Sequence, residues 1–331
     1  MKKIYLLAVG GTIAYVGGNK TDKSGGQLLK EANLNTESEI EIIARDVLRK
    51  GSAQLSMGDL FLIAGKAKEA IQEGADGIVI THGTDTLEET AFFLNLTVPH
   101  TIPLVITGAM KHGALLGADG SANVSAAITA AASRSLQKEG CVVVFDDKVL
   151  PSWYVRKTHT QFLETFQSQF GPIGYFSEGN LRMVVSVKTP ARLENFEELS
   201  GKDRLPEVYI ETVFAGNDGR MLKKAKESGY QGIVIEGAGG GHCSSEMAAA
   251  IEELGRDYPV IMSSRTGTGE VLNRTYSGGA GSEVRLLEKG VIYSGILDSR
   301  KSRILLILLL SKGYDVDKIR NVFANYSVFD D

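Results

Sequence analysis

Cysteine and long apolar runs are both scarce in this sequence. Its 331 residues include 2 cysteines, Cys141 and Cys243, too few for the disulfide framework of a small secreted domain. The longest unbroken apolar run covers residues 304–310, whereas a transmembrane helix needs about 20 apolar residues. We therefore expect a fold held by its own core, with no membrane partner.

An excess of positive charge is also lacking. The chain has 36 Lys and Arg against 40 Asp and Glu, which gives a formal net charge of -4. Proteins that bind nucleic acid usually carry a basic excess or stripe, so we expect no nucleic-acid partner. The hydrophobic content of 43% is typical of globular proteins, and the length suits two medium domains.

The start of the chain lacks the features of a signal peptide. Residues 4–9 are apolar, but Gly10, Gly11 and Thr12 follow at once, without a full-length apolar core and a cleavage region. We interpret residues 4–9 as a buried strand and expect a cytoplasmic chain.

Apolar runs alternate with helical patterns along the first half of the chain. We expect strands over residues 4–9, 77–80, 104–107, 142–145 and 183–187, and helices over residues 37–49, 59–72, 86–96 and 122–136. Apolar strands separated by helices are typical of a parallel sheet covered on both faces. The sequence therefore predicts an α/β fold with a mostly parallel, doubly wound, flavodoxin-like sheet.

A polar stretch containing Pro190 and Pro206 interrupts this alternation, and the strand–helix pattern resumes after it. We place a linker over residues 189–206, between a larger N-terminal domain (1–188) and a smaller C-terminal α/β domain (207–331). In the second domain we expect strands over residues 208–212, 232–235 and 260–263, and helices over residues 219–228, 245–254, 301–310 and 316–325.

Two threonine-bearing loops follow predicted strands directly. The segment 10–14 reads GGTIA, and the segment 81–86 reads THGTDT. Ligands bind outside the carboxyl ends of the strands in open parallel sheets, and glycine backbone lets N–H groups approach a substrate. A hydroxyl nucleophile needs a base, such as a neutral lysine or a tyrosinate, and an oxyanion site. Thr12 and Thr84 are therefore candidate nucleophiles, and Asp85 suits a substrate ammonium group; the structural alternative is that all three cap helices or close turns.

These loops resemble the two signature motifs of the bacterial-type asparaginase/glutaminase family. Further similar segments are 107–110, 118–120, Asn123, 157–160, 171–175, 190–192 and 263–265, so the resemblance covers nearly the whole chain. It implies an amidohydrolase that cleaves the side-chain amide of asparagine, and in some members glutamine, without a metal or organic cofactor.

The resemblance also implies roles for single residues. Thr12 is similar to the threonine that forms an acyl-enzyme; Thr84, Asp85 and Lys157 resemble the second catalytic group, in which the lysine tunes the threonine hydroxyl. Asp85 would also bind the α-ammonium group, and Ala109 lies in a segment similar to the family's third-strand segment. Which threonine attacks first stays open at this stage.

The sequence departs from the family at the expected carboxylate subsite. Aligned on Met57, Gln54 and Leu55 occupy the positions of a polar pair that binds the substrate α-carboxylate. Ser56 is a substitute if the alignment shifts by one residue, and an N-cap of the following helix is the alternative role. A leucine in that pocket would leave a carboxylate without a partner.

Two more departures concern the lid and the neighbouring subunit. The mobile loop lacks the expected tyrosine near Gly25 and Gly26, so Tyr15 is either a substitute or a hydrophobic lid residue. His242 stands where a neighbouring subunit of the family lends an asparagine, and its alternative role is structural. Because the resemblance places each site between two subunits, we expect a homotetramer built from close dimers.

These departures leave alternatives to asparagine hydrolysis. The substrate is then a related amide or a D-amino-acid amide, or the protein is a non-catalytic amino-acid-binding relative. A dinucleotide fingerprint and a Walker lysine loop are missing, and no pair among the 5 histidines has the i, i+4 spacing of a metal-binding helix. The sequence thus predicts a small amino-acid amide as the partner, with no cofactor and no metal.

Overall fold

The computed structural model describes residues 1–14, 23–31, 40–187, 192–193 and 204–327. The chain divides into two compact units, Met1–Ser200 and Gly201–Asp331. Most of the predicted linker and the predicted lid residue Tyr15 lie outside the described residues. Because nothing tests the domain limits 1–188 and 207–331, they stay predictions.

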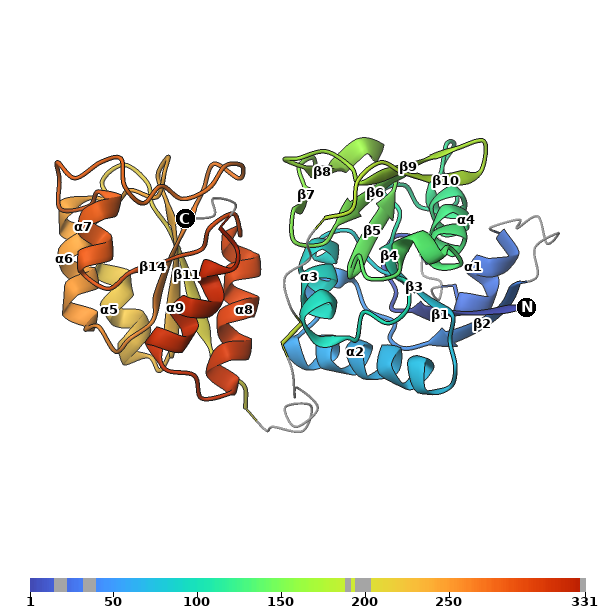
Figure 1. Cartoon of the computed structure of the whole chain (residues 1–331), viewed down its shortest axis with the longest axis horizontal. Coiled ribbons are helices and arrows are strands. Elements are labelled where there is room, and N and C mark those ends of the chain that lie inside the picture. Colours follow the sequence, from blue (N-terminus) through green and yellow to red (C-terminus); the bar gives the residue numbers. More distant parts are fainter. Residues whose placement is uncertain (15–22, 32–39, 188–191, 194–203, 328–331) are drawn as a thin grey trace. The chain divides into compact units, whose positions relative to one another are not determined.

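Within its described residues, the first unit contains an eight-stranded sheet in the order β10-β9-β6-β5-β4-β3-β1-β2 (Figure 1). Its strands are β1 (Lys2–Ala8), β2 (Ile40–Asp46), β3 (Gly77–Thr81), β4 (Leu104–Thr107), β5 (Cys141–Phe145), β6 (Lys148–Pro151), β9 (Gly174–Ser177) and β10 (Asn180–Met183). The five strands β2-β1-β3-β4-β5 are parallel, and this is the flavodoxin-like order. β6, β9 and β10 extend the sheet in antiparallel fashion. The predicted fold class is confirmed.

The helix predicted over residues 37–49 is wrong. Residues 40–46 form strand β2, which pairs in parallel with β1 from Lys2↔Ile40 to Ala8↔Asp46. Ile40, Ile42 and Ala44 alternate along this edge strand and pack on the core, which is the period of a strand. Isoleucine also favours strands, so tertiary pairing and β-propensity together outweigh the helical spacing.

The strand predicted over residues 183–187 is also misplaced. β10 ends at Met183, and residues 184–187 are irregular. The sequence analysis missed the antiparallel strands β6 and β9, and the two-stranded sheet formed by β7 (Val155–Lys157) and β8 (Phe166–Ser168). These strands have only three or four residues each, too few to show a period.

Helices cover both faces of the large sheet (Figure 1). They are α1 (Gly25–Glu31), α2 (Met57–Gln72), α3 (Leu87–Thr97) and α4 (Gly120–Ala131), with short 3-10 turns η1 (Ser52–Gln54), η2 (Arg134–Leu136) and η3 (Leu163–Thr165). α1 and α4 pack on one face through a core that includes Leu28, Val124 and Ile128, while α2 and α3 meet on the other through Phe61 and Phe93. The connections β3–α3–β4 and β4–α4–β5 both lead to the next strand in the same direction across the sheet. Because α3 and α4 lie on opposite faces, these two crossovers have opposite handedness.

The strand order of the parallel sheet changes direction at β1. β1 connects to β2 on one side, whereas β3, which pairs with the other edge of β1, leads to β4 and β5. Such a topological switch point opens a crevice outside the carboxyl ends of the two strands. The loops that carry Thr12 and Thr84 begin at these two ends.

His82 ties the loop after β3 to helix α3. The ring is fully buried, with Nδ1 2.7 Å from the Gly83 carbonyl oxygen and Nε2 3.0 Å from the Thr90 hydroxyl. Because a carbonyl oxygen only accepts, Nδ1 carries the proton and Nε2 accepts from Thr90. Burial lowers the pKa of His82 to about 4, so a neutral ring anchors the backbone next to Thr84.

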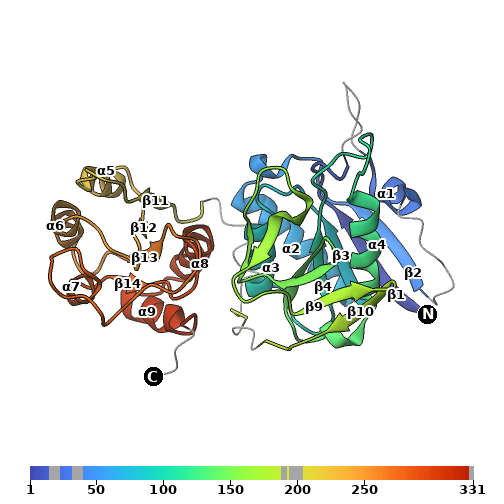
Figure 2. The ribbon, with the colours of Figure 1, turned by 90° about the horizontal axis from the view of Figure 1, so that it is seen from above.

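The second unit contains, in its described part, a parallel four-stranded sheet in the order β11-β12-β13-β14. The strands are β11 (Val208–Thr212), β12 (Gly232–Gly237), β13 (Val260–Ser264) and β14 (Ile292–Tyr293). Helices α5 (Arg220–Glu227), α6 (Ser245–Leu254) and α7 (Glu283–Glu288) lie on one side, and α8 (Ser299–Ser311) and α9 (Val316–Ala324) on the other (Figure 2). No helix of the described chain is both long and apolar enough to cross a membrane.

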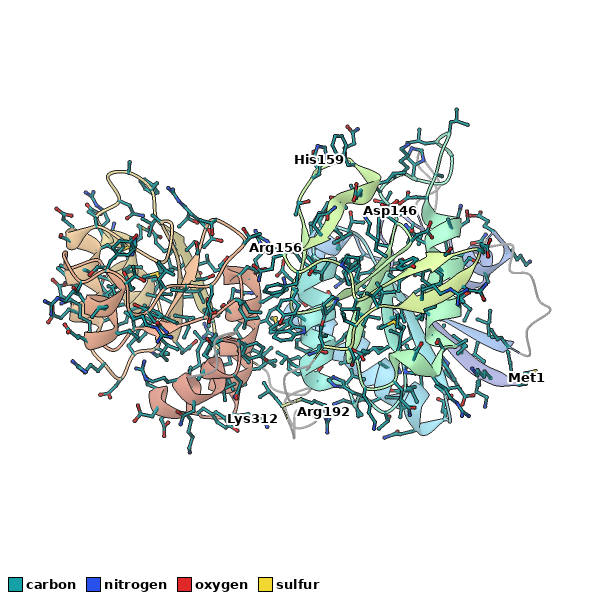
Figure 3. All side chains as sticks on the ribbon, turned by 45° about the horizontal axis from the view of Figure 1, so that its top comes forward. Met1, Asp146, Arg156, His159, Arg192 and Lys312 are labelled. Carbon is teal, nitrogen blue, oxygen red and sulfur yellow. The ribbon has the colours of Figure 1, made fainter. Side chains whose placement is uncertain are left out.

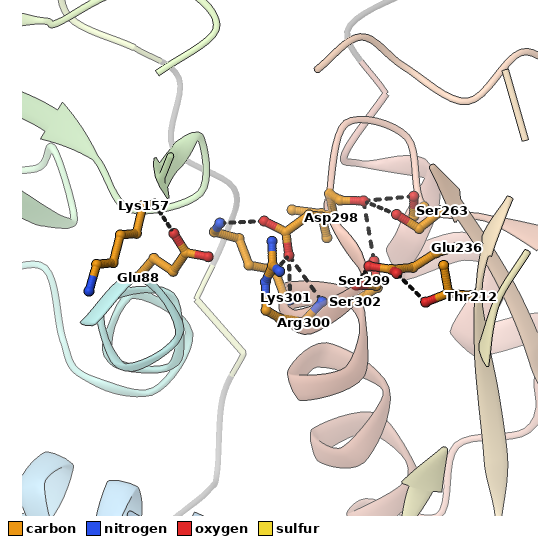
Figure 4. Close-up of polar contacts among 12 residues, drawn as sticks. Glu88, Lys157, Thr212, Glu236, Ser263, Asp298, Ser299, Arg300, Lys301 and Ser302 are labelled. Atoms are coloured by element: carbon orange, nitrogen blue, oxygen red, sulfur yellow. Dashed lines mark hydrogen bonds and ion pairs between the residues drawn. The ribbon is translucent and has the colours of Figure 1, made fainter. Parts of the chain in front are cut away.

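A polar network joins α8 to the carboxyl edge of the second sheet (Figure 4). Asp298 caps α8 by accepting from the Arg300 and Lys301 amides, and the buried Lys301 ammonium lies 2.7 Å from its carboxylate. Glu236, at the end of β12, accepts hydrogen bonds from Thr212 and Ser299. These contacts orient α8 at the ends of β11 and β12.

Folding stability should fall as the pH is lowered from about 6.5 to about 4. His82 has a pKa of about 4 in the folded state and about 6.5 when unfolded, so in this window the unfolded state binds the extra proton. The free energy of unfolding is not reduced by His82 above pH 6.5, and it falls by about 3 kcal/mol between pH 6.5 and pH 4. Urea unfolding of wild type and His82→Gln at both ends of this window measures it.

The variant should lose this part of the pH slope, while the control Thr129→Ala on helix α4, which changes no titratable group, should keep the wild-type slope. Equal slopes for wild type and His82→Gln would contradict the assignment.

Candidate active site

The two threonine loops touch through glycine backbone. Gly10 and Gly11 have φ angles of +118° and +88°, and a β-carbon on Gly11 would lie 2.3 Å from the Gly83 Cα. Only glycine fits such an approach at a positive φ. The contact places the residues that follow, Thr12 and Thr84, in adjoining loops at the carboxyl ends of β1 and β3.

Thr12 lies in the turn that follows, where the Ala14 amide donates to the Gly11 carbonyl at 3.0 Å. Its side chain is half-buried, and its hydroxyl has no hydrogen-bond partner among the residues that the structure describes. A hydroxyl that caps a helix or closes a turn would be engaged by the backbone. The hydroxyl of Thr12 is therefore available to a substrate.

Thr84, Asp85 and Lys157 form a contiguous polar group. The Lys157 ammonium nitrogen lies 3.0 Å from the Thr84 hydroxyl oxygen and 2.7 Å from the Asp85 carboxylate. Thr84 is 6% exposed, whereas the Asp85 side chain is 65% exposed. The lysine thus meets a buried hydroxyl on one side and a solvent-accessible carboxylate on the other, although it is 72 residues distant from Asp85 in the sequence.

The strand β7 brings Lys157 to this group. Lys157 is the last residue of β7, which pairs in antiparallel fashion with β8. The chain continues into the turn bearing His159, which Figure 3 labels. The Lys157 amide donates to the carboxylate of Glu88 in the first turn of α3 (Figure 4), so the backbone is held while the ammonium group contacts Thr84.

Ser52 is a site residue that the sequence analysis missed. Its hydroxyl accepts from the Asp85 amide at 3.1 Å, and its carbonyl accepts from the Thr86 hydroxyl at 2.9 Å. A β-carbon on Gly83 would lie 2.7 Å from the Ser52 hydroxyl oxygen. The erroneous helix over residues 37–49 hid the signal, because the segment after a strand parallel to β1 must reach the same edge of the sheet.

Ser56 and Gln54, the candidates for binding the substrate α-carboxylate, lie in the segment 52–56 between β2 and α2. We call this segment the carboxylate rim. The Ser56 hydroxyl caps helix α2, where it donates to the Asp59 carboxylate at 2.7 Å and accepts from the Asp59 amide. This is the capping role that the sequence left as the alternative. Gln54 is exposed and follows Ser52 in the 3-10 turn η1, so its side chain is accessible to a ligand. Substrate binding by either residue stays a prediction.

Ala109 follows β4 and is fully buried, so its substrate-binding role stays a prediction. The surrounding turn is held by Asp119, which accepts from the Met110 and Lys111 amides at 3.0 and 2.9 Å. Asn123 donates to the Gly108 carbonyl at 3.0 Å. The position of this backbone is therefore fixed by the first turn of α4.

His242 belongs to the second unit, where it follows β12 in a glycine-rich turn bridged by Ala238. Its Nε2 lies 2.7 Å from the fully buried carboxylate of Glu283, and Tyr276 packs edge-on against its ring at 5.3 Å. Although burial opposes ionisation, hydrogen bonds from the Tyr276 amide and His242 hold the pKa of Glu283 below its usual range. Glu283 therefore stays charged and accepts from a protonated Nε2.

Within the described ranges, no group of three or more His, Cys, Asp or Glu side chains is arranged to hold a metal ion. Cys141 and Cys243 are free cysteines, and burial raises the pKa of Cys243 to about 12.

Comparisons with known proteins agree with this geometry. The family profile described as "Asparaginase, N-terminal" matches residues 3–188, and the profile "Glutaminase/Asparaginase C-terminal domain" matches residues 207–323. "L-asparaginase 2" of Escherichia coli (strain K12) is 33% identical, over 98% of this chain and 94% of that protein. "Probable L-asparaginase periplasmic" of Haemophilus influenzae is 31% identical, over 98% and 93% of the two chains.

A solved structure is similar over nearly its full length. It is described as a "Probable Cytoplasmic L-asparaginase" from Campylobacter jejuni, with a TM-score of 0.86 and 31% identity over 98% of this chain and 99% of that one. The resemblance predicted from the loop motifs is confirmed: the chain belongs to the asparaginase/glutaminase family.

Proposed function

We propose that this protein hydrolyses the side-chain amide of L-asparagine to aspartate and ammonia through a threonine acyl-enzyme. One observation carries the proposal: Lys157 contacts both Thr84, at 3.0 Å, and Asp85, at 2.7 Å, beside the loop that bears Thr12. Membership of the family supports the same reaction.

The substrate's charged end belongs at Asp85. The Asp85 carboxylate is accessible and lies at the crevice. The Asp85 amide donates a hydrogen bond to the Ser52 hydroxyl, which holds the residue in place. A second cation at Asp85, the substrate α-ammonium, would sit opposite Lys157 and leave the carboxylate with a partner on each side. That placement points the side-chain amide toward the threonines.

In the first half-reaction the Thr12 oxygen attacks the amide carbon, and its proton passes to the leaving nitrogen. The C–N bond breaks, ammonia departs, and an ester links the acyl group to Thr12. Backbone N–H groups of the two glycine-rich loops stabilise the negative charge on the carbonyl oxygen, since these groups need no reorganisation during the reaction.

In the second half-reaction water replaces ammonia. Thr84, whose hydroxyl accepts from Lys157, orients the water, and one proton of the water passes to the Thr12 oxygen as the water attacks the ester carbon. The ester C–O bond breaks, Thr12 regains its proton, and the acid leaves. No step requires a redox group or a metal ion.

The side chains of the carboxylate rim favour a second class of candidate substrate. Ser56 is engaged by Asp59, and Leu55 offers no polar group to an α-carboxylate, so recognition of the substrate backbone differs from the expected family pattern. Glutamine and D-asparagine are the amides that test this difference. Binding without turnover would instead support the amino-acid-binding alternative.

We also propose a homotetramer of close dimers in which His242 serves the site of a neighbouring chain. The glycine-rich turn and Glu283 hold His242 at the carboxyl edge of the second sheet, and its ring is partly exposed. As compartment we propose the cytoplasm, because the Campylobacter relative is described as cytoplasmic; fractionation of producing cells tests it, since another relative is named periplasmic.

Removing either active-site hydroxyl or the lysine should abolish turnover. We expect Thr12→Ala to lower kcat for asparagine by about a thousandfold or more, and Thr84→Val and Lys157→Met by about a hundredfold or more. Ammonia release from asparagine, glutamine and D-asparagine measures the effect. Thr129→Ala, on helix α4, is the matched control and should keep wild-type activity.

An active Thr12→Ala enzyme would refute the acyl-enzyme mechanism. Wild-type protein that binds asparagine in calorimetry but releases no ammonia would refute hydrolysis itself.

Serine variants separate the two roles assigned to the rim. Ser52→Ala removes the acceptor of the Asp85 amide, so KM for asparagine should rise about tenfold. Ser56→Ala removes a helix cap, so it should lower the free energy of unfolding by about 1 kcal/mol and leave KM unchanged. Steady-state kinetics and urea unfolding of both variants give the comparison; the reverse pattern would move the binding role back to Ser56.

Mixed oligomers test the shared site. Thr12→Ala subunits retain His242, and His242→Ala subunits retain Thr12, so hybrids made by co-expression should regain activity that neither variant has alone. Sedimentation should report a tetramer. Hybrids no more active than the average of the parents, or a fully active monomer, would rule out a site completed by a neighbour.

A further inference from the structure

Glu88 is a buried carboxylate beside the catalytic group. It is 4% exposed, and it lies in the first turn of α3, three residues after Asp85. Its carboxylate accepts a hydrogen bond from the main-chain amide of Lys157 (Figure 4). A carboxylate is placed inside a protein only where it is well partnered, because its desolvation is costly.

The hydrogen bond from the Lys157 amide to the Glu88 carboxylate holds the lysine backbone in place. The lysine side chain runs alongside Glu88 (Figure 4), and its ammonium group contacts Thr84 and Asp85. Residues 84, 85 and 88 all belong to the loop and first turn of α3, so the lysine is attached to one rigid segment at both its amide and its ammonium group. β7 itself has three residues and one ladder partner, β8, and by itself constrains Lys157 weakly.

We propose that Glu88 is a positioning residue for the amide hydrolysis: by holding the Lys157 amide it sets the reach of the ammonium group to the Thr84 hydroxyl. This inference rests on the proposed function, in which Lys157 tunes Thr84. A displacement of a reacting group by about 1 Å can cost a hundredfold in rate, so a backbone contact outside the substrate pocket affects catalysis.

Glu89 provides a matched control on the same helix turn. Both residues put a negative charge in the first turn of α3, where either one stabilises the helix through its dipole. The Lys157 amide bonds to Glu88. A purely structural role of acidic charge at this helix end would therefore appear equally in both variants.

The kinetic test compares Glu88→Ala, Glu88→Gln and Glu89→Ala. We expect kcat for asparagine to fall about 10- to 100-fold in Glu88→Ala, with KM changed less than about threefold because Ser52 holds Asp85 independently. Glu88→Gln keeps an acceptor oxygen and should recover kcat to within about threefold of wild type. Glu89→Ala should leave both parameters unchanged.

A second readout does not depend on turnover. Trace acetylation with acetic anhydride, followed by mass spectrometry of the Lys157 peptide and of an exposed reference lysine, Lys66, measures how firmly the ammonium group is held. We expect Lys157 to label severalfold faster relative to Lys66 in Glu88→Ala than in wild type, and at the wild-type rate in Glu89→Ala.

Equal kcat losses in Glu88→Ala and Glu89→Ala, or unchanged Lys157 labelling in Glu88→Ala, would overturn the proposal. If wild type releases no ammonia from any amide, the proposed function fails, but the labelling ratio still decides whether Glu88 positions Lys157. If Glu88→Ala does not fold, the labelling comparison uses Glu88→Gln and Glu88→Asp. Labelling of Lys157 at the wild-type ratio in both variants supports the acceptor role of Glu88, and faster labelling in both overturns it.

Discussion

The close approach of two glycine backbones is the constraint on which the rest of the site depends. Gly11 and Gly83 follow adjacent parallel strands, and no side chain fits between them. Their contact closes the bottom of the crevice at the switch point of the sheet and places two threonines one residue beyond it. Every chemical role assigned to Thr12 and Thr84 presupposes this packing, since hydroxyls on separated loops could not act on one carbonyl.

Around this contact the site is assembled from distant parts of the chain. The segment after β2 contributes Ser52, the loop after β3 contributes Thr84 and Asp85, and a short antiparallel ribbon contributes Lys157. The Asp85 amide donates to Ser52 and the Lys157 amide to Glu88, while side-chain hydrogen bonds join Lys157 to Thr84 and Asp85, so the charged groups sit on rigid elements. Such preorganisation lets the fixed groups stabilise charge that develops during the reaction without first moving.

The recognition side of the site differs from its catalytic side. The group of Thr84, Asp85 and Lys157 is complete, whereas the rim carries Leu55 and a serine engaged in capping helix α2. In the second unit, a hydrogen bond to the buried Glu283 holds His242 in the glycine-rich turn. The proposed catalytic group is thus present, whereas the proposed substrate-binding residues differ from those that the resemblance implies.

Sequence alone sufficed for features written in local pattern: the alternation of buried strands with helices, and two glycine–threonine loops placed directly after strands. It failed where pairing between distant segments overrides local spacing, as in β2, and where strands are too short to show a period, as in β7 and β8. Tertiary structure alone decided which partner each polar side chain has: it gave Ser56 to a helix cap, and it brought Ser52 and Glu88 to the catalytic loop. The physical reason is that hydrogen bonds form between atoms close in space, and sheet pairing, not order along the chain, sets which atoms become neighbours.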